Sequence, residues 1–360
     1  MIRLHFPLIL IVVACCGCES PNDDSSVNSK SADNETNKLT TTASQKADTP
    51  VGAHNKETGT GRNTTPSDDK EQYISFPAAG VRLVRPLGFD DAESFHGFGQ
   101  PSTQSSVMVV MIPGPFSEIA AGFTTERLKT QGMTLVSKRD IEINGNTGVL
   151  MGATQTANRT EFAKWIVAFG NEKETKMITA TFPTAHKDKL SAHLKSVVLG
   201  ARIDQSARPA PGADVGFTIA ASDKLKLTQG VGKSIFYTKD GVTPIKSPED
   251  PMFVAAPSLS KVPILDPQRF AVRRIYQITP NTKISSIIAN NAITIDGLDG
   301  YEIEAEAEDA KTGTPLVVYQ VMLFDEGAYL LMVGIVGAKV SAEYLPEFKS
   351  MARSLTRKQK

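Results

Sequence analysis

The sequence predicts an α+β protein with two tandem domains, each an antiparallel sheet with helices packed on it, behind a disordered N-terminal tether. Three observations predict it. The composition changes abruptly near residue 72, short apolar runs alternate with turn residues beyond that point, and one strand-turn-strand pattern occurs twice. With 360 residues, 40% of them hydrophobic, the chain can build a sizeable core.

The first fourteen residues have the features of a signal peptide. Arg3 supplies a positive charge, and an apolar run from Phe6 leads to Cys15. A membrane-spanning helix needs about 20 apolar residues, and this run is too short. The order Val-Val-Ala-Cys resembles the lipobox of bacterial lipoproteins, which implies lipidation of Cys15 as the new N-terminus. Cys18, which follows Gly17, is the alternative site.

Residues 15–72 are predicted to be the lipid anchor and a disordered tether. From Glu19 to Gln72 the chain is rich in Ser, Thr, Asn, Asp, Lys and Gly, and it contains almost no residues that could form a core. A flexible chain of this length has an r.m.s. reach of roughly 40 Å. By the lipoprotein sorting rule, the absence of aspartate directly after Cys15 implies the outer membrane in a cell with two membranes. The chain is therefore expected in the cell envelope, exposed to the periplasm or the exterior.

Cysteine content and charge exclude several classes of protein. All three cysteines lie between positions 15 and 18, so the folded part has neither a disulfide nor a thiolate metal site. The formal net charge is zero, which gives no basis for binding nucleic acid.

A weak internal duplication divides the folded part. Residues 141–148 and 293–300 both read as a strand, a tight turn and a second strand, with Asn144-Gly145 and Asp296-Gly297 at the turns. Such pairs favour a type I′ turn, because both central residues need positive φ. Residues 194–197 and 348–351 match in the same order, near the end of each copy. The predicted domains are 73–204 and 215–357, joined by a linker over 205–214.

The elements of the first copy follow from periodicity. We expect strands over 81–85 and 106–112, then an amphipathic helix over 117–130. A hairpin across Asn144-Gly145 follows. The copy ends with strands over 161–169 and 177–182 and a helix over 185–199.

The second copy repeats this scheme with an insertion. Strands are expected over 217–220, 234–237, 252–255, 292–295, 301–308, 316–324 and 328–335. Helices are expected over 266–277 and 342–354. The insertion, residues 241–267, is rich in proline. It could wrap a partner or cap a sheet edge.

The pattern resembles the PsbP-like fold, an α/β/α sandwich. The residues that carry the resemblance are Gly80-Val81-Arg82-Leu83, Pro86-Leu87-Gly88-Phe89, the central helix, Ile143-Asn144-Gly145 and the closing helix. The second copy lacks the Pro-Leu-Gly-Phe element. The resemblance implies a fold used for docking and assembly, and it implies no catalytic residue.

Two motifs suggest chemistry but lack its context. Gly230-Val231-Gly232-Lys233-Ser234 looks like the end of a phosphate-binding loop, yet Leu227 replaces the first glycine and a strand follows. Three histidines lie in the predicted domains: His96, His186 and His193. We expect His186 and His193 to face solvent and to lie too far apart to share a metal ion. We therefore predict no catalytic, cofactor-binding or metal-binding residues.

Two further features are candidates for functional sites. Glu302, Glu304, Glu306 and Glu308 alternate along a strand, so they share one face. We expect a solvated face paired with basic side chains of the next strand, with calcium binding as a minor hypothesis. Trp165, the single tryptophan, is expected in the core.

The preferred functional hypothesis is a membrane-anchored, non-enzymatic interaction module of the cell envelope with a protein partner and no cofactor. The alternative is a carrier of a small ligand or cation. An interaction module should expose an apolar surface, whereas a carrier should hold a pocket between the sheet and a helix. An enzyme should cluster perturbed ionisable groups.

Overall fold

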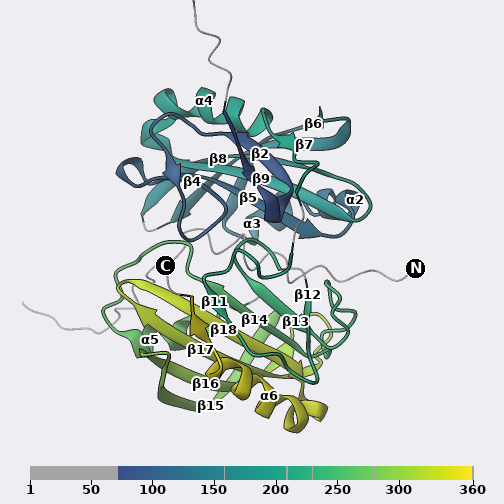
Figure 1. Ribbon diagram of the computed structural model, residues 1–360, viewed down its shortest axis with the longest axis vertical. Helices are drawn as coiled ribbons and strands as arrows, with labels where there is room; N and C mark the ends of the chain where they lie inside the picture. Colours follow the sequence, from purple (N-terminus) through teal and green to yellow (C-terminus); the bar gives the residue numbers. More distant parts are fainter. Residues whose placement is uncertain (1–71, 158, 208–209, 229, 279–280, 359–360) are drawn as a thin grey trace, which may run out of the picture. The chain divides into compact units, whose positions relative to one another are not determined.

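A computed structural model describes residues 72–157, 159–207, 210–228, 230–278 and 281–358. Within this part the chain forms two seven-stranded antiparallel sheets with helices packed on them (Figure 1). The predicted α+β class is confirmed. The signal peptide, Cys15, Cys18 and the tether lie outside the described residues.

The first sheet has the strand order β3-β4-β5-β9-β8-β7-β6. Its strands are β3 (Asp90–Asp91), β4 (Gly97–Gln100), β5 (Ser105–Pro113), β6 (Met133–Ile143), β7 (Asn146–Ala157), β8 (Thr160–Gly170) and β9 (Glu174–Pro183). A small sheet stands beside it, formed by β1 (Tyr73–Phe76), β2 (Val81–Val84) and β10 (Arg202–Ile203).

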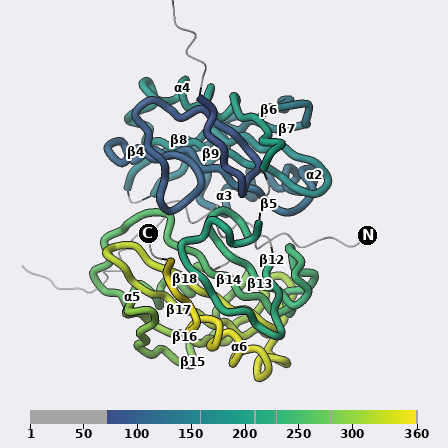
Figure 2. The backbone as a smooth tube through the Cα atoms, viewed as in Figure 1, coloured from purple at the N-terminus to yellow at the C-terminus, as the bar shows by residue number. Residues whose placement is uncertain are grey.

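The second sheet has the strand order β12-β13-β14-β18-β17-β16-β15. Its strands are β12 (Lys226–Thr228), β13 (Ile235–Thr238), β14 (Met252–Pro257), β15 (Thr282–Ile295), β16 (Leu298–Asp309), β17 (Pro315–Asp325) and β18 (Ala328–Gly337). A separate pair joins β11 (Phe217–Thr218) to β19 (Thr356–Arg357). Figure 2 traces β14 beside β18, although the two strands are far apart in sequence.

The two sheets share one topology. In each, three strands pair in sequence, the third pairs with the last, and the remaining strands return to the opposite edge. The predicted turns occupy the same place, between β6 and β7 and between β15 and β16. Asn144 and Gly145 have φ of 52° and 73°, and Asp296 and Gly297 have the same values. The expected positive φ at both central residues is confirmed.

Helices cover both faces of each sheet. In the first, α4 (Lys187–Leu199) packs on β8 and β9, while α2 (Phe116–Ala120) and α3 (Thr125–Lys129) cover the other face. In the second, α5 (Pro267–Ile275) packs on β16 and β17, and α6 (Ser341–Arg353) covers the opposite face. The remaining elements are short 3-10 helices: η1 (Pro77–Ala79), η2 (Pro101–Thr103), η3 (Thr184–His186) and η4 (Ala338–Val340).

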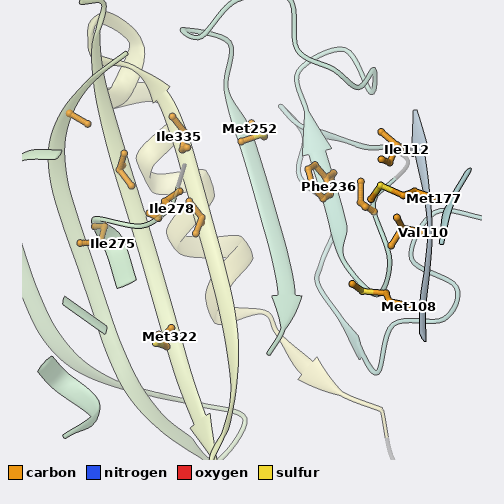
Figure 3. Close-up of a cluster of buried hydrophobic side chains, with 14 of the residues drawn as sticks. Met108, Val110, Ile112, Met177, Phe236, Met252, Ile275, Ile278, Met322 and Ile335 are labelled. Atoms are coloured by element: carbon orange, nitrogen blue, oxygen red, sulfur yellow. The ribbon is translucent and has the colours of Figure 1, made fainter. Parts of the chain in front are cut away.

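The buried apolar side chains form three clusters. One lies between the first sheet and α4, and one between the second sheet and α6. The third combines both sheets with α2 and α5. Figure 3 shows Met108, Val110 and Met177 of the first sheet near Phe236 of the second. The described residues belong to one compact unit.

Three predicted elements differ from the structure. The helix expected over 117–130 is two short helices, because the chain turns at Gly122 and Thr124 caps α3 by accepting a hydrogen bond from the Arg127 amide. The strand expected over 217–220 is shorter, and it pairs with β19 outside the main sheet. The strand expected over 292–295 begins at Thr282.

The strand expected over 252–255, within the insertion, is confirmed. The segment Met252–Pro257 is β14, an interior strand between β13 and β18, and not a cap on a sheet edge. The residues that follow β14 run beside the β17–β18 turn, where the Ser258 amide donates to Tyr329 and the Val262 amide donates to Gly327. This path leads the chain into α5.

Candidate functional site

The long strand β15 forms one edge of the second sheet. Among the described residues it pairs with β16 alone, in antiparallel register. Its fourteen residues, TKISSIIANNAITI, include one charged side chain, Lys283, and no proline. A strand at a sheet edge presents backbone N–H and C=O groups that a further strand can pair with.

The corresponding edge of the first sheet is charged. Strand β6 has the sequence MTLVSKRDIEI, with Lys138, Arg139, Asp140 and Glu142 in its second half. Charged side chains on an edge strand discourage another chain from pairing there. Strands β6 and β15 are the equivalent edge strands of two sheets with the same topology. Strand β15 lacks most of the charged side chains that protect β6.

Bulges give β15 an exposed apolar side chain. The pairing with β16 shifts between Ile284 and Ser286 and again between Ile287 and Ala289. Ile284 and Ile287 pack against the third cluster, whereas Ile288, at the second bulge, is 59% exposed. Strand β6 has a similar bulge, at which Val136 is 66% exposed.

The four carboxylates of β16 lie on one face of the strand next to this edge, and two of them pair with α6. Glu302 accepts from the Tyr319 hydroxyl at 2.7 Å and pairs with Arg353 at 2.9 Å, and Glu304 pairs with Lys349 at 2.6 Å. The expected pairing with the next strand holds for Glu308, which lies 2.8 Å from Lys283 of β15. The expectation of a solvated face is wrong for Glu302, which α6 covers.

Glu306 differs from the other three carboxylates. It is exposed, and the bond recorded for it is from the Ser286 hydroxyl of β15, at 2.9 Å. Each carboxylate thus engages a different partner. Among the described residues no group of three or more His, Cys, Asp or Glu side chains is placed to hold a metal ion.

Burial explains the largest shift of a pKa in this region. The phenol of Tyr319 is fully buried, and desolvation together with its hydrogen bond to Glu302 raises its pKa far above the usual range. The hydroxyl therefore stays protonated as a donor. Tyr319, Glu302 and Arg353 join β16, β17 and α6 as a structural network.

The predicted histidines do not come together. His96 is buried, and its Nε2 lies 3.6 Å from Asp214. Burial lowers the pKa of His96, an effect that Asp214 opposes. His193 is exposed and accepts from the Leu87 amide, whereas His186 is half-buried before α4, so its expected solvent-facing position is only partly met.

The glycine-rich loop is followed by β13, not by a helix. Lys233 donates to the backbone carbonyls of Ala92 and Glu93, and burial lowers its pKa. Ser234 donates to the Val231 carbonyl within the loop. These residues form a turn that contacts the first sheet's β3–β4 segment, and the phosphate-loop interpretation has no support in the geometry.

Trp165 is half-buried and not in the centre of the core. Its indole N–H donates to the Ser191 hydroxyl of α4 at 3.0 Å, and the Lys195 ammonium lies 4.4 Å from the ring centre. The tryptophan therefore helps α4 to pack on β8.

The middle of the insertion, from Met252 to Leu259, forms part of a small cavity. The cavity lies between the sheet face made by β14 and β18 and the end of α5. Its place, between a sheet and a helix, is where the carrier hypothesis expects a pocket.

Sequence reasoning missed the β15 edge because residues 282–291 do not alternate cleanly. The two bulges interrupt the period of two, and Ser, Asn and Ile fall on both faces. The available signal was the uncharged run before the predicted Asp-Gly turn.

No known protein family matches the sequence, and no curated protein matches it. Several solved structures are similar. The cyanobacterial PsbP of Synechocystis is 11% identical, covers 37% of this chain and 91% of its own, and has a TM-score of 0.28. LpqN of Mycobacterium tuberculosis, described as involved in cell envelope biogenesis, is 16% identical over 40% of this chain and 83% of its own, with a TM-score of 0.28.

A third similar structure covers more of this chain. The type VI secretion immunity protein TplEi of Pseudomonas aeruginosa is 13% identical over 75% of this chain and 96% of its own, with a TM-score of 0.27. Solved structures similar to this chain thus include PsbP and proteins of the bacterial envelope and secretion systems. Among the residues that the structure describes, no helix is long and apolar enough to cross a membrane.

Proposed function

We propose that this chain is a non-enzymatic interaction module of the cell envelope that binds an extended segment of a partner protein along β15. The observation that carries the proposal is the long, nearly uncharged edge of the second sheet. Strand addition to such an edge derives affinity from backbone hydrogen bonds and specificity from alternate side chains. The charged β6 edge offers no equivalent site.

The residues beside the edge define the partner's chemistry. On the α5 face, an added strand would lie next to Ile284 and Ile287, which favours apolar side chains. On the α6 face it would lie next to Ser286, with the exposed Glu306 one strand further away. Neighbouring strands are about 4.8 Å apart, so a lysine or arginine of the added strand can reach Glu306. The expected segment alternates apolar and basic residues.

The proposal includes a lipid anchor and a tether. Lipidation at Cys15, or at Cys18, would hold the chain at the membrane, and residues 15–72 would let the domains reach a partner. We place the anchor in the outer membrane. The two domains, 73–204 and 215–357, would be tandem copies of a PsbP-like sandwich, which their common strand order and matching turns support.

Metabolic labelling with a fatty-acid probe tests the anchor. We expect label on the wild-type chain, loss of label in Cys15→Ser and retention in Cys18→Ser. The reverse result assigns lipidation to Cys18. Absence of label from the wild-type chain contradicts the anchor.

A pair of matched positions tests the β15 edge. A photocrosslinking amino acid is placed at Ile288 or at Val136, both exposed side chains at bulges of edge strands. In the native host we expect adducts from position 288 and none from position 136. The crosslinked partner segment is identified by mass spectrometry, synthesised and titrated onto the full chain.

The titration separates strand addition from other contacts. We expect the peptide to slow amide hydrogen exchange in β15 and to bind at least tenfold more weakly to Ile288→Lys, because an edge lysine opposes pairing. Val136→Lys should bind within twofold of the wild type, and Glu306→Gln should weaken binding of a basic peptide. Protection outside β15, or adducts from both positions, would refute the proposed edge.

A further inference from the structure

A cavity of about 60 Å³ lies inside the second domain, between its sheet and the end of α5. Side chains of β14 and β18 line it, among them Met252 and Ile335, and so does Ile278, which follows α5. Figure 3 labels these three side chains. The residues after β14, Ser258 and Leu259, complete one side. The lining is almost entirely apolar, which favours a hydrocarbon group inside.

Two polar groups interrupt this apolar lining. Arg274 of α5 is buried, at 9% exposure, and it is the one charged residue among the described residues that line the cavity. Ser258 is 6% exposed. Its Oγ accepts from the Tyr329 amide at 3.1 Å, and among the described residues its own hydroxyl proton has no recorded acceptor. A guanidinium and a hydroxyl donor thus stand beside one apolar space.

We propose that this cavity binds a monocarboxylate with a short aliphatic chain. The chain would occupy the apolar space, and the carboxylate would accept from Arg274 and from the Ser258 hydroxyl. A planar carboxylate matches the guanidinium, and charge-assisted bonds of this kind are strong where water is excluded.

The size of the cavity limits the chain. A water-sized sphere occupies about 10–15 Å³ of such a cavity, so the space admits a chain of about five heavy atoms. Hexanoate is therefore a suitable probe. Hexanol, which has the same chain length and no charge, is the neutral control ligand.

The experiment measures binding of both probes to the full chain in a nonionic detergent by ligand-observed NMR, with the detergent alone as background. We expect hexanoate to bind at least tenfold more tightly than hexanol. Arg274→Gln should weaken hexanoate at least tenfold and leave hexanol nearly unchanged, whereas Arg269→Gln, on an exposed position of the same helix, should change neither. Equal binding of the two probes to the wild type would overturn the proposal.

A second variant fills the cavity without touching its charge. Ala256→Leu, in β14, should weaken both probes, and Ala185→Leu, at an exposed position of the first domain, should weaken neither. If Arg274→Gln does not fold, the wild-type comparison and Ala256→Leu still decide the question. Hexanoate binding that survives Ala256→Leu places the ligand elsewhere and contradicts the inference. The site is independent of the β15 edge, so either proposal can fail alone.

Discussion

At the scale of single residues, Asp204 shows how one carboxylate can join two segments that are far apart in the sequence. It follows β10 and accepts hydrogen bonds from Ser75 at 2.5 Å and from Ser206 at 2.6 Å. The pKa of Asp204 is lowered to about 2, mainly by the hydrogen bond from the Ser206 side chain and next by the hydrogen bond from the Ser75 side chain. Asp204 thereby ties β1 to the segment after β10.

The depressed pKa predicts a dependence of stability on pH. The ordinary value is 3.8, so the contribution of Asp204 is fully present above about pH 4 and is lost as the pH falls towards 2. We expect Asp204→Asn to lower the urea midpoint at pH 6, with the difference from the wild type shrinking between pH 4 and pH 2. Asp223→Asn, at an exposed position, is the control. A difference that stays constant down to pH 2 would show that Asp204 acts through packing alone.

At the scale of elements, the contact between α6 and β18 depends on a glycine. A Cβ atom at Gly334 would lie 2.3 Å from Cδ2 of Phe348, whose ring is buried and stacks on Phe253 at 5.9 Å. The helix can lie this close to the sheet because position 334 has no side chain.

Substitution of this glycine tests the close approach. Gly334→Ala forces the Phe348 ring or α6 to move, so we expect a loss of about 1–3 kcal/mol in the free energy of unfolding, measured by urea denaturation. Gly99→Ala is the control, since a Cβ there meets nothing within 4 Å. If both variants lose the same stability, the cause is the strand backbone and not the ring.

The sequence predicts the elements whose signals are local. The Asn144-Gly145 and Asp296-Gly297 turns, the apolar strands β8 and β17 and the helices α4 and α6 follow from period and turn chemistry. The break at Gly122 does not, because the apolar spacing continues through it and the cap at Thr124 is decided by local hydrogen bonds. Strand β15 begins earlier than expected, since it takes its register from β16 rather than from its own alternation.

The candidate sites also combine features that local sequence patterns predict with features that depend on packing. The proline-rich segment 241–267 contains several of the residues that line the cavity, from Met252 to Leu259. No sequence pattern predicts that Arg274 and Ser258 line one cavity, because only the packing of α5 on the sheet creates that space. The edge position of β15 likewise depends on strand order, which is a property of the whole sheet.

At the scale of the whole molecule, the third cluster contains side chains of both sheets. Clusters confined to one sheet would allow the two halves to unfold separately, whereas shared burial couples them. Trp165, the single tryptophan, reports on the first half.

This coupling gives a test. Phe253 is fully buried in the second half, so Phe253→Ala should cost about 3–5 kcal/mol. We expect the urea midpoint reported by Trp165 fluorescence to fall together with the midpoint from circular dichroism. A Trp165 midpoint that stays at the wild-type value would show independent halves.

The pairing of β14 with β18 also bears on how the chain acquires its structure. In both sheets the third strand pairs with the last strand, and three other strands lie between the two in the sequence. Contacts so distant in sequence slow folding, and a growing chain cannot complete either sheet until its final strand has been synthesised. A nascent polypeptide with this strand order therefore stays unfolded for longer than one built from sequential hairpins.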